Sequence, residues 1–184
     1  PFKPGELVIG ARGTFFARSI DAEVNLTTDC MVAASKHDGL SVIEVLVNCM
    51  IFNNGTHKAF AGDKEVRAEH TITLRHGEKM LFGKNMDKGL MLDNMKLKVV
   101  TVGENGVTLD DILVHDAHEK DTMVHVMLAS MKYPDYPVAL GVIRDVEAPT
   151  YEHEVARQIA EVQATAKIKN VDDLLNSGET WEVE

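Results

Sequence analysis

Cys49 is the residue best placed to do chemistry, because it closely follows the apolar run at residues 41–47. In open α/β sheets, functional groups lie just beyond the carboxyl ends of the strands. A cysteine there serves as a metal ligand or a reactive thiol, whereas most free cysteines are small buried hydrophobic residues. One cysteine does not build a metal site, so partner ligands would have to come from elsewhere. Cys30 is expected to pack in the core rather than to form a disulfide with Cys49.

Two histidines three residues apart, His115 and His118, form a second candidate, with Asp116 and Asp121 nearby. On a helix this spacing places both imidazoles on one face, as a metal site requires. Zinc motifs usually supply a third ligand at a defined distance, so surface or hydrogen-bonding histidines are the favoured interpretation. The sequence contains no phosphate-binding GxxxxGK or GxGxxG motif and no GxSxG motif.

The elements that position Cys49 follow a strand–helix–strand pattern. Residues 14–16 are β-branched and aromatic, which suits a strand, and residues 41–47 form a second β-prone run. The second run is almost continuously apolar, which predicts burial on both faces of a parallel sheet. The helix between them is indicated by residues that recur at helical spacing: Leu26, Cys30, Ala33, Ala34 and His37. Asn25, Thr27 or Thr28 is expected to cap its start, and Gly39 to follow its end. The pattern predicts a parallel βαβ unit.

The remainder of the chain predicts a mixture of short strands and helices. Residues 53–70 are polar and suggest a long surface loop, and residues 71–75 and 78–82 suggest a hairpin turning at His76-Gly77. Further strands are expected at 97–102 and 137–143. Thr108 is expected to cap a short helix over 110–117, and further helices are expected from residue 121 and over 151–168.

Size and charge limit the class of protein. The chain has 184 residues, which suits one domain or one domain with an appendage. A formal net charge of −10 disfavours a nucleic-acid partner, which would need a basic face. No apolar run approaches the roughly 20 residues that span a bilayer, so no membrane partner is expected. Two cysteines do not make a disulfide framework, and the reducing cytoplasm is the expected compartment.

Several segments together resemble the β subunit of 2-oxoacid:ferredoxin oxidoreductases, most closely the 2-oxoglutarate type. The N-terminal segments are GARGTFFARS at 10–19 and HDGLSVIEVLVNCMIFNN at 37–54. The later ones are RHGEKMLFGKNMDKG at 75–89, DDILVHDAH at 110–118 and GVIRDVEAPTY at 141–151. The later segments resemble the C-terminal extension of these subunits, so the resemblance covers nearly the whole chain.

The resemblance implies oxidative decarboxylation of a 2-oxoacid on thiamine diphosphate, with transfer of electrons through an iron–sulfur cluster to ferredoxin and formation of an acyl-coenzyme A. In this family the β subunit carries the thiamine diphosphate and Mg2+ site, pairs with an α subunit, and in many members holds one 4Fe-4S cluster. Cys49 matches the fourth cluster cysteine, which lies in a Pro-Cys element. Asn48 stands here in place of that proline.

The family's GDGD-type magnesium motif and its first cluster cysteines have no counterpart in this sequence. The chain is therefore expected to be the C-terminal portion of the subunit, with the N-terminal half missing. Alone it is expected to be catalytically inactive, neither binding thiamine diphosphate nor completing a cluster. The expected fold is α/β: residues 1–55 form the C-terminal part of a thiamine-diphosphate-binding parallel-sheet domain, and residues 56–184 form an α+β extension. The expected partners are the missing half, the α subunit and ferredoxin. The alternative is a stand-alone, non-catalytic α/β module that serves in binding or assembly.

Overall fold

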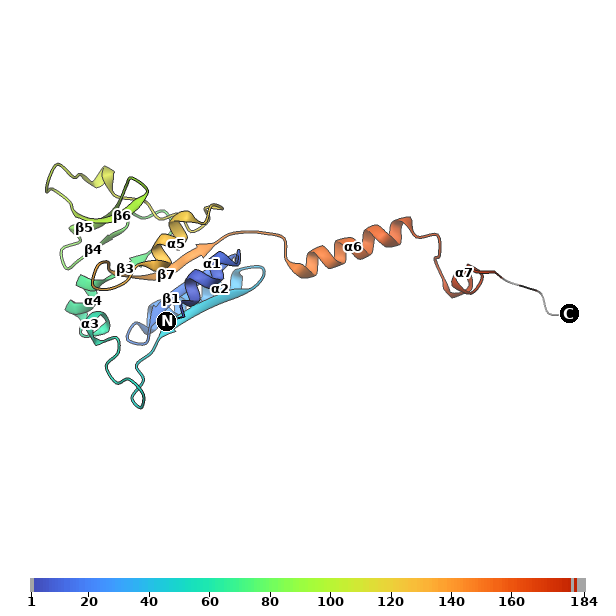
Figure 1. The fold of residues 1–184 in the computed structure, drawn as a ribbon, viewed down its shortest axis with the longest axis horizontal. Helices are drawn as coiled ribbons and strands as arrows, with labels where there is room; N and C mark the ends of the chain where they lie inside the picture. Colours follow the sequence, from blue (N-terminus) through green and yellow to red (C-terminus); the bar gives the residue numbers. More distant parts are fainter. Residues whose placement is uncertain (1, 180, 182–184) are drawn as a thin grey trace. The chain divides into compact units, whose positions relative to one another are not determined.

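The computed structural model describes residues 2–179 and 181, and the chain divides into two compact units (Figure 1). The first unit is Pro1–Ala148 and the second is Pro149–Glu184. The boundary proposed from the sequence at residue 55 stays a prediction. The first unit contains both sheets and every candidate site residue, so it is described first.

A four-stranded sheet organises the first unit, in the order β2-β1-β7-β3. Strands β1 (Phe15–Ile20) and β2 (Ser41–Leu46) are parallel, as the βαβ pattern predicts. Strand β7 (Val138–Asp145) runs antiparallel to β1, and β3 (Thr71–Leu74) runs parallel to β7. The α/β fold class predicted from the sequence is confirmed, although the sheet is mixed rather than wholly parallel.

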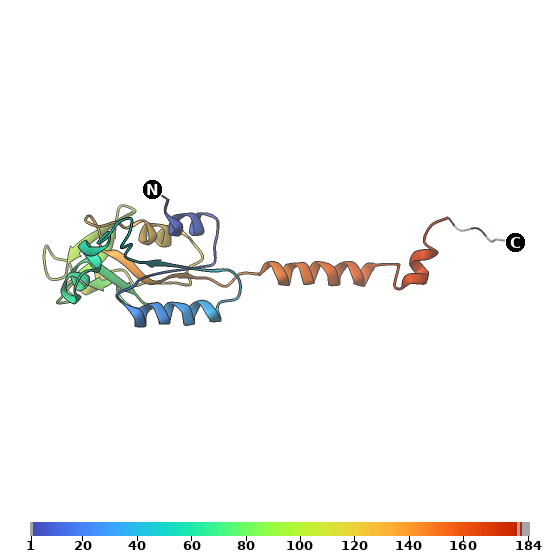
Figure 2. The same ribbon diagram turned by 90° about the horizontal axis from the view of Figure 1, so that it is seen from below.

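Helices cover both faces of this sheet (Figure 2). Helix α2 (Val24–Lys36) lies on one face, while α1 (Pro4–Gly10) and α5 (Met123–Ser130) lie on the other. Because successive strand residues point to opposite faces, Phe15 packs with Cys30 of α2, whereas Phe16 packs with Leu128 of α5. Both phenylalanines are completely buried, and each such burial stabilises the fold by about 1.5–3 kcal/mol.

The start of α2 differs from the predicted cap. The N-cap residue is Glu23, which makes no side-chain cap hydrogen bond. The hydroxyls of Thr27 and Thr28 instead donate to the carbonyls of Glu23 and Val24, four residues earlier. Both threonines therefore lie inside the first turns, where their hydroxyls bond back to the helix. Gly39 follows the helix with a φ of +117°, a conformation that favours glycine.

The predicted long loop at 53–70 is wrong in its second half. Two short helices occupy it, α3 (Lys58–Ala61) and α4 (Lys64–His70). Asp63 caps α4, because its carboxylate accepts hydrogen bonds from the backbone amides of Glu65 and Val66. This polar segment therefore forms a capped helix, because the Asp63 side chain satisfies the first backbone amides of the helix, which water would otherwise have to satisfy.

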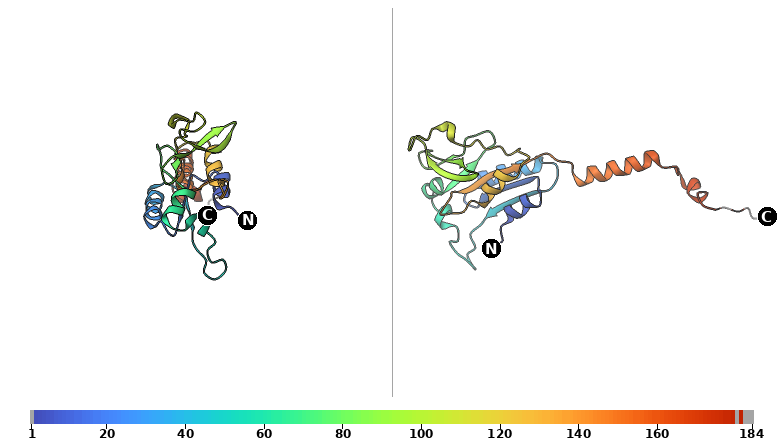
Figure 3. Two further views of the ribbon diagram at one scale, coloured as in Figure 1. Left: turned by 90° about the vertical axis from the view of Figure 1, so that its left-hand side faces the viewer. Right: turned by 45° about the horizontal axis from the view of Figure 1, so that its top comes forward.

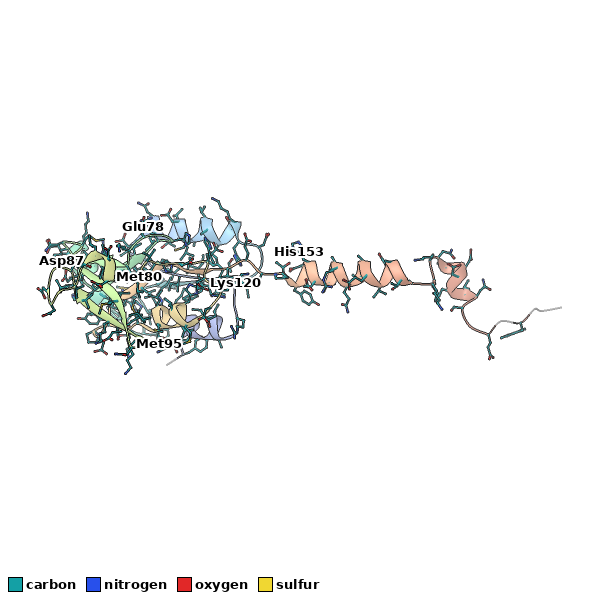
Figure 4. The ribbon with its side chains drawn as sticks, turned by 90° about the horizontal axis from the view of Figure 1, so that it is seen from above. Glu78, Met80, Asp87, Met95, Lys120 and His153 are labelled. Carbon is teal, nitrogen blue, oxygen red and sulfur yellow. The ribbon has the colours of Figure 1, made fainter. Side chains whose placement is uncertain are left out.

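The predicted hairpin at His76-Gly77 is also wrong. Strand β3 pairs with the distant β7, and β4 (Leu81–Phe82) pairs with β5 (Lys88–Asp93) in a second sheet completed by β6 (Lys96–Thr101). The turn after β3 instead bonds to residue 115: the amide of Gly77 donates to the carbonyl of His115, whose own amide donates to Glu78. Met80, just before β4, is buried, whereas Met95 lies exposed at the β5–β6 turn (Figure 4).

The predicted helix over 110–117 is wrong in its length, because the structure has only one 3-10 turn there, η1 (Leu109–Asp111). Thr108 caps this turn as expected, and Asp111 returns the contact to the Thr108 amide. Residues 113–115 then extend along residues 77–80, where their backbone groups find partners outside a helix. Helix α5 forms within the segment after residue 121, where the sequence predicts a helix.

The second unit contains α6 (Tyr151–Thr165) and α7 (Val171–Leu175), in agreement with the predicted helix over 151–168. Thr150 caps α6 by accepting a hydrogen bond from the amide of His153 (Figure 4). Arg157 forms ion pairs with Glu154 and Glu161, one turn to either side. Within residues 2–179 and 181, no helix is both long enough and apolar enough to cross a bilayer.

Candidate functional site

Cys49 lies at the carboxyl end of β2, where the sequence predicts it. It is half-buried and pairs with Asn53 through an isolated β-bridge, so the chain reverses within four residues. We call residues 48–55 the Cys49 loop. The segment between β2 and α3, which contains this loop, projects beyond the end of the strand (Figures 1 and 3).

A backbone amide of the same loop approaches the sulfur of Cys49. The amide nitrogen of Phe52 lies 3.4 Å from Sγ. The hydrogen bond from the amide of Phe52 is the largest cause that lowers the pKa of the Cys49 thiol. The thiolate is the form that binds metals and attacks electrophiles, so this loop stabilises the reactive state of the residue.

The same loop exposes three large apolar side chains in a row. Met50, Ile51 and Phe52 are 71%, 86% and 90% exposed. Exposed apolar side chains that are contiguous, rather than scattered, are typical of surfaces that contact another protein. Cys49 is therefore flanked by a surface suited to a macromolecular partner.

Asn48 closes the base of the loop. Its side-chain oxygen accepts a hydrogen bond from the amide of Gly55 at 2.7 Å, and its side-chain nitrogen donates to Oδ1 of Asn54 at 3.0 Å. The first residue of the loop thus bonds to the last two. Gly55 has a φ of +80°, and this left-handed turn returns the chain toward Asn48.

The end of β2 is attached to the end of β1. Asp21 donates its amide to the carbonyl of Leu46 at 3.1 Å, and its carboxylate accepts from the amide of Asn48 at 3.0 Å. Within the two strands, Arg18 and Glu44 face each other in register and form an ion pair of 2.6 Å. These contacts fix the strand end from which the Cys49 loop departs.

Strand β2 lies at an edge of the sheet and pairs only with β1 among the strands that the structure describes. All six of its residues are half-buried, which differs from the predicted burial on both faces. Val42 packs toward the α1 and α5 side and Ile43 toward α2, so both faces are apolar but incompletely covered. The sequence of β2 is thus as apolar as that of an interior strand, although β2 lies at an edge of the sheet.

Cys30 packs in the core, as predicted. It is 1% exposed on the inner face of α2, and burial raises the pKa of its thiol to about 11. Both cysteines are free thiols. The two thiols therefore differ sharply, one buried and protonated and the other accessible and hydrogen-bonded by amides.

His115 and His118 do not share a helix face, because the segment is extended there. His115 is buried and donates from Nε2 to the carbonyl of Val142 at 2.8 Å, while His118 donates from Nδ1 to the carbonyl of Asp145 at 2.5 Å. The hydrogen-bonding interpretation is correct for both. Across residues 2–179 and 181, no three His, Cys, Asp or Glu side chains are grouped to hold a metal ion.

No sequence motif predicts the buried pair formed by His125 and Arg144. Arg144 donates to His125 Nδ1 at 2.9 Å and to the carbonyls of Gly13, Glu119 and Lys120. Burial lowers the pKa of His125, which stays neutral and accepts from the guanidinium. The pair ties α5 and the loop before it to β7, and we assign it a structural role.

A cavity of about 250 Å³ is lined by residues of α2, β3 and β7 and of the segments 75–76 and 117–118. It does not include Cys49. Its lining mixes apolar and charged groups: Leu26, Asp29, Cys30, Thr73, Leu74, Arg75, His76, Ala117, His118, Gly141, Val142 and Asp145. Three of its polar side chains, His76, His118 and Asp145, bond to the protein itself.

The chain is 32% identical over 187 aligned residues to the 2-oxoglutarate oxidoreductase subunit KorB of Mycobacterium tuberculosis (strain ATCC 25618 / H37Rv). The match covers 100% of this chain and 49% of that protein, so the chain spans about half the length of this curated relative. No protein-family model matches the chain.

A solved structure shares the fold. It is a chain of the 2-oxoglutarate:ferredoxin oxidoreductase from Magnetococcus marinus, determined with 2-oxoglutarate, coenzyme A and succinyl-CoA bound. The superposition has a TM-score of 0.56 and covers 98% of this chain and 45% of that one. At 13% sequence identity, this likeness establishes the fold alone.

Proposed function

We propose that this chain is the C-terminal portion of the β subunit of a 2-oxoglutarate oxidoreductase. The whole chain is related to about half of such a subunit, which confirms the resemblance predicted from its motifs. In the complete enzyme this portion extends the cofactor-binding sheet, supplies Cys49 as one ligand of a 4Fe-4S cluster, and contacts the α subunit. The reaction proposed for that enzyme is the oxidative decarboxylation of 2-oxoglutarate to succinyl-coenzyme A, with ferredoxin as electron acceptor.

The observation that carries the proposal is the setting of Cys49. It combines a strand end, an accessible thiol whose pKa is lowered by backbone amides, and a flanking apolar surface. Hydrogen bonds from backbone amides to ligand sulfur tune the potential of iron–sulfur clusters. Cys49 thus fits one cluster position, and the other three ligands belong to the rest of the subunit in this proposal.

The described residues fit the thiamine diphosphate and Mg2+ site less well. A diphosphate is held through Mg2+ by one or two carboxylates and further oxygen ligands, and the GDGD-type motif that the resemblance implies for them has no counterpart in this sequence. We therefore place that site outside this chain. When bound, thiamine diphosphate supplies carbanion stabilisation and the cluster supplies electron transfer; this chain supplies support and one thiolate.

The edge strand β2 supports the proposed assembly with the remaining half of the subunit. An apolar strand that is half-buried on both faces and unpaired along one edge is a ready partner for a further strand. The proposed compartment is the reducing cytoplasm, in keeping with two free thiols.

Reconstitution tests the proposed function. The α subunit and the remaining part of the β subunit are combined with or without this chain, and 2-oxoglutarate-dependent and coenzyme A-dependent reduction of ferredoxin is measured. We expect activity only when the chain is present. Equal activity without it would overturn the proposal.

One observation favours the alternative, a stand-alone binding or assembly module. The first unit closes a core of its own, in which Phe15, Phe16, Ile72 and Leu90 are completely buried. A chain that needed its other half for any core would not bury these residues. The oligomeric state of the chain, treated in the Discussion, separates the two possibilities.

A further inference from the structure

We propose that Asn48, together with Asp21, is a positioning device that holds the Cys49 loop in the shape that presents the sulfur. The inference rests on the proposed function only for the identity of what Cys49 binds. The device itself is a property of residues 21 and 48–55, and it is testable in this chain.

The first part of the device is the side chain of Asn48, which spans the base of the loop. Its oxygen accepts from the amide of Gly55 at 2.7 Å and its nitrogen donates to Asn54 at 3.0 Å. Between these anchors only five residues remain, and the carbonyl of Cys49 accepts from the amide of Asn53 at 3.1 Å. A loop this short, closed at its base, leaves the intervening backbone few alternative conformations.

The second part is the carboxylate of Asp21, which fixes the backbone of Asn48. Asp21 follows β1 and accepts from the Asn48 amide at 3.0 Å, while its own amide bonds to Leu46. The parallel pairing of β1 with β2 thus continues for one more step past the end of the strands. Asn48 is therefore anchored to β1 through its backbone and to the far side of the loop through its side chain.

The closed loop directs the backbone amide of Phe52 toward the sulfur of Cys49. The Phe52 amide reaches Sγ at 3.4 Å because the chain turns back between residues 49 and 53. All the groups that bond to Asn48 in the loop are exposed, so water competes for each of them once the closure is broken. A proline at position 48 restricts φ but has neither the amide that reaches Asp21 nor the side chain that reaches Gly55. The asparagine thus holds the loop by hydrogen bonds, whereas the Pro-Cys element that the resemblance implies would restrict it by a ring.

Residue-resolved amide hydrogen exchange of this chain tests the device. Asn48→Ala removes two loop-closing hydrogen bonds, so we expect exchange at Gly55, Phe52 and Asn53 to accelerate about tenfold. Asp21→Ala removes the other anchor and should accelerate exchange at Asn48 itself. Asn48→Asp keeps an acceptor for the Gly55 amide and should retain its protection. Asp21→Asn likewise keeps an acceptor for the Asn48 amide.

The matched control is Asn53→Ala, which removes another asparagine of the same loop. The Asn53 side chain donates to the hydroxyl of Thr56 and does not bond across the base, so Gly55 should remain protected. Amides of β1 and β7 report whether each variant keeps the fold. If Asn48→Ala leaves Gly55 and Phe52 as protected as in the wild type while the sheet is intact, the proposal is overturned. Release of Gly55 without release of Phe52 would also overturn it, because Asn48 would then not control the amide at the sulfur.

The outcome is distinguishable from that of the proposed function. Cluster ligation by Cys49 is read from the iron content of the complete subunit, whereas the loop closure is read from amide exchange in this chain alone. Exchange that responds to Asn48→Ala, with iron content indifferent to Cys49→Ala, would support the positioning device and refute the ligand.

Discussion

His37 and Asp145 join the end of α2 to the end of β7, with Nδ1 of the imidazole 2.7 Å from Oδ1 of the carboxylate. Nε2 of the same ring lies 2.8 Å from the hydroxyl of Thr14, just before β1. The His37 side chain is 3% exposed. A single buried imidazole therefore connects three elements of the first unit, among them the antiparallel strand that the βαβ pattern does not include.

Replacing His37 by alanine should destabilise the first unit. The change leaves the half-buried Thr14 and Asp145 without their partner and removes the buried imidazole between them, and the free energy of unfolding should fall by about 1–3 kcal/mol. Urea denaturation followed by circular dichroism measures the effect. Asp38→Ala, at an exposed neighbouring position, is the control and should change stability little. An equal effect of both substitutions would contradict the assigned role of His37.

The stability of the first unit should decline as the pH falls below about 6.5. Burial is the largest cause that lowers the pKa values of His115 and His125 from their ordinary value of 6.5. Below pH 6.5 the unfolded chain binds protons that the folded chain does not. The free energy of unfolding therefore has its full value above pH 6.5 and decreases as the pH falls. Each such proton contributes at most about 1.4 kcal/mol per pH unit.

His115→Gln tests this pH dependence, because glutamine keeps a donor for the Val142 carbonyl and removes the titrating group. The loss of stability between pH 7 and pH 5.5 should be smaller in the variant than in the wild type. His153→Gln, exposed on α6, serves as the control. A pH dependence unchanged by His115→Gln would show that other groups account for it.

The chain alone should not bind thiamine diphosphate. Its sequence lacks the GDGD-type magnesium motif, and a diphosphate without its metal loses the charge neutralisation that holds it. Isothermal titration with thiamine diphosphate and Mg2+ should give no binding heat. Micromolar affinity would place the cofactor site within this chain and contradict our assignment.

The chain should self-associate through the free edge of β2. Light scattering coupled to gel filtration should show a mass that rises with concentration. Val47→Lys adds a charge to the exposed end of this edge and should reduce the association, because charged edges resist strand pairing. Leu109→Lys, at a position of similar exposure in η1, should not. A monodisperse 20 kDa species at all concentrations would favour the stand-alone module.

The sequence predicts best where a pattern is local. The spacing of Leu26, Cys30 and Ala33 identifies α2, because residues three or four apart in the sequence lie on the same face of a helix. The β3–β7 pairing joins residues 71–74 to 138–141, and no local pattern encodes that distance. The predicted hairpin failed for this reason, since it assigned β3 the nearest strand instead of the strand that buries it.

At the site, the position of Cys49 is predictable and its support is not. The apolar run before the cysteine indicates a strand end, and the polar residues from 53 onward indicate a loop after it. That Asn48 bonds to Gly55, and that Asp21 reaches Asn48 from another strand, depends on parallel register and loop closure. The departure from proline at position 48 was the one available signal.

The central claim is that Cys49 is a cluster ligand, and the iron content of the complete subunit tests it most directly. Wild type, Cys49→Ala and Cys30→Ala are purified without oxygen, and iron and visible absorbance are measured per subunit. Cys30 is the matched control, because it is the other of the two cysteines and is buried. We predict that Cys49→Ala loses iron or becomes oxygen-labile while Cys30→Ala keeps its cluster. Full iron, absorbance and oxygen stability in Cys49→Ala would contradict the account.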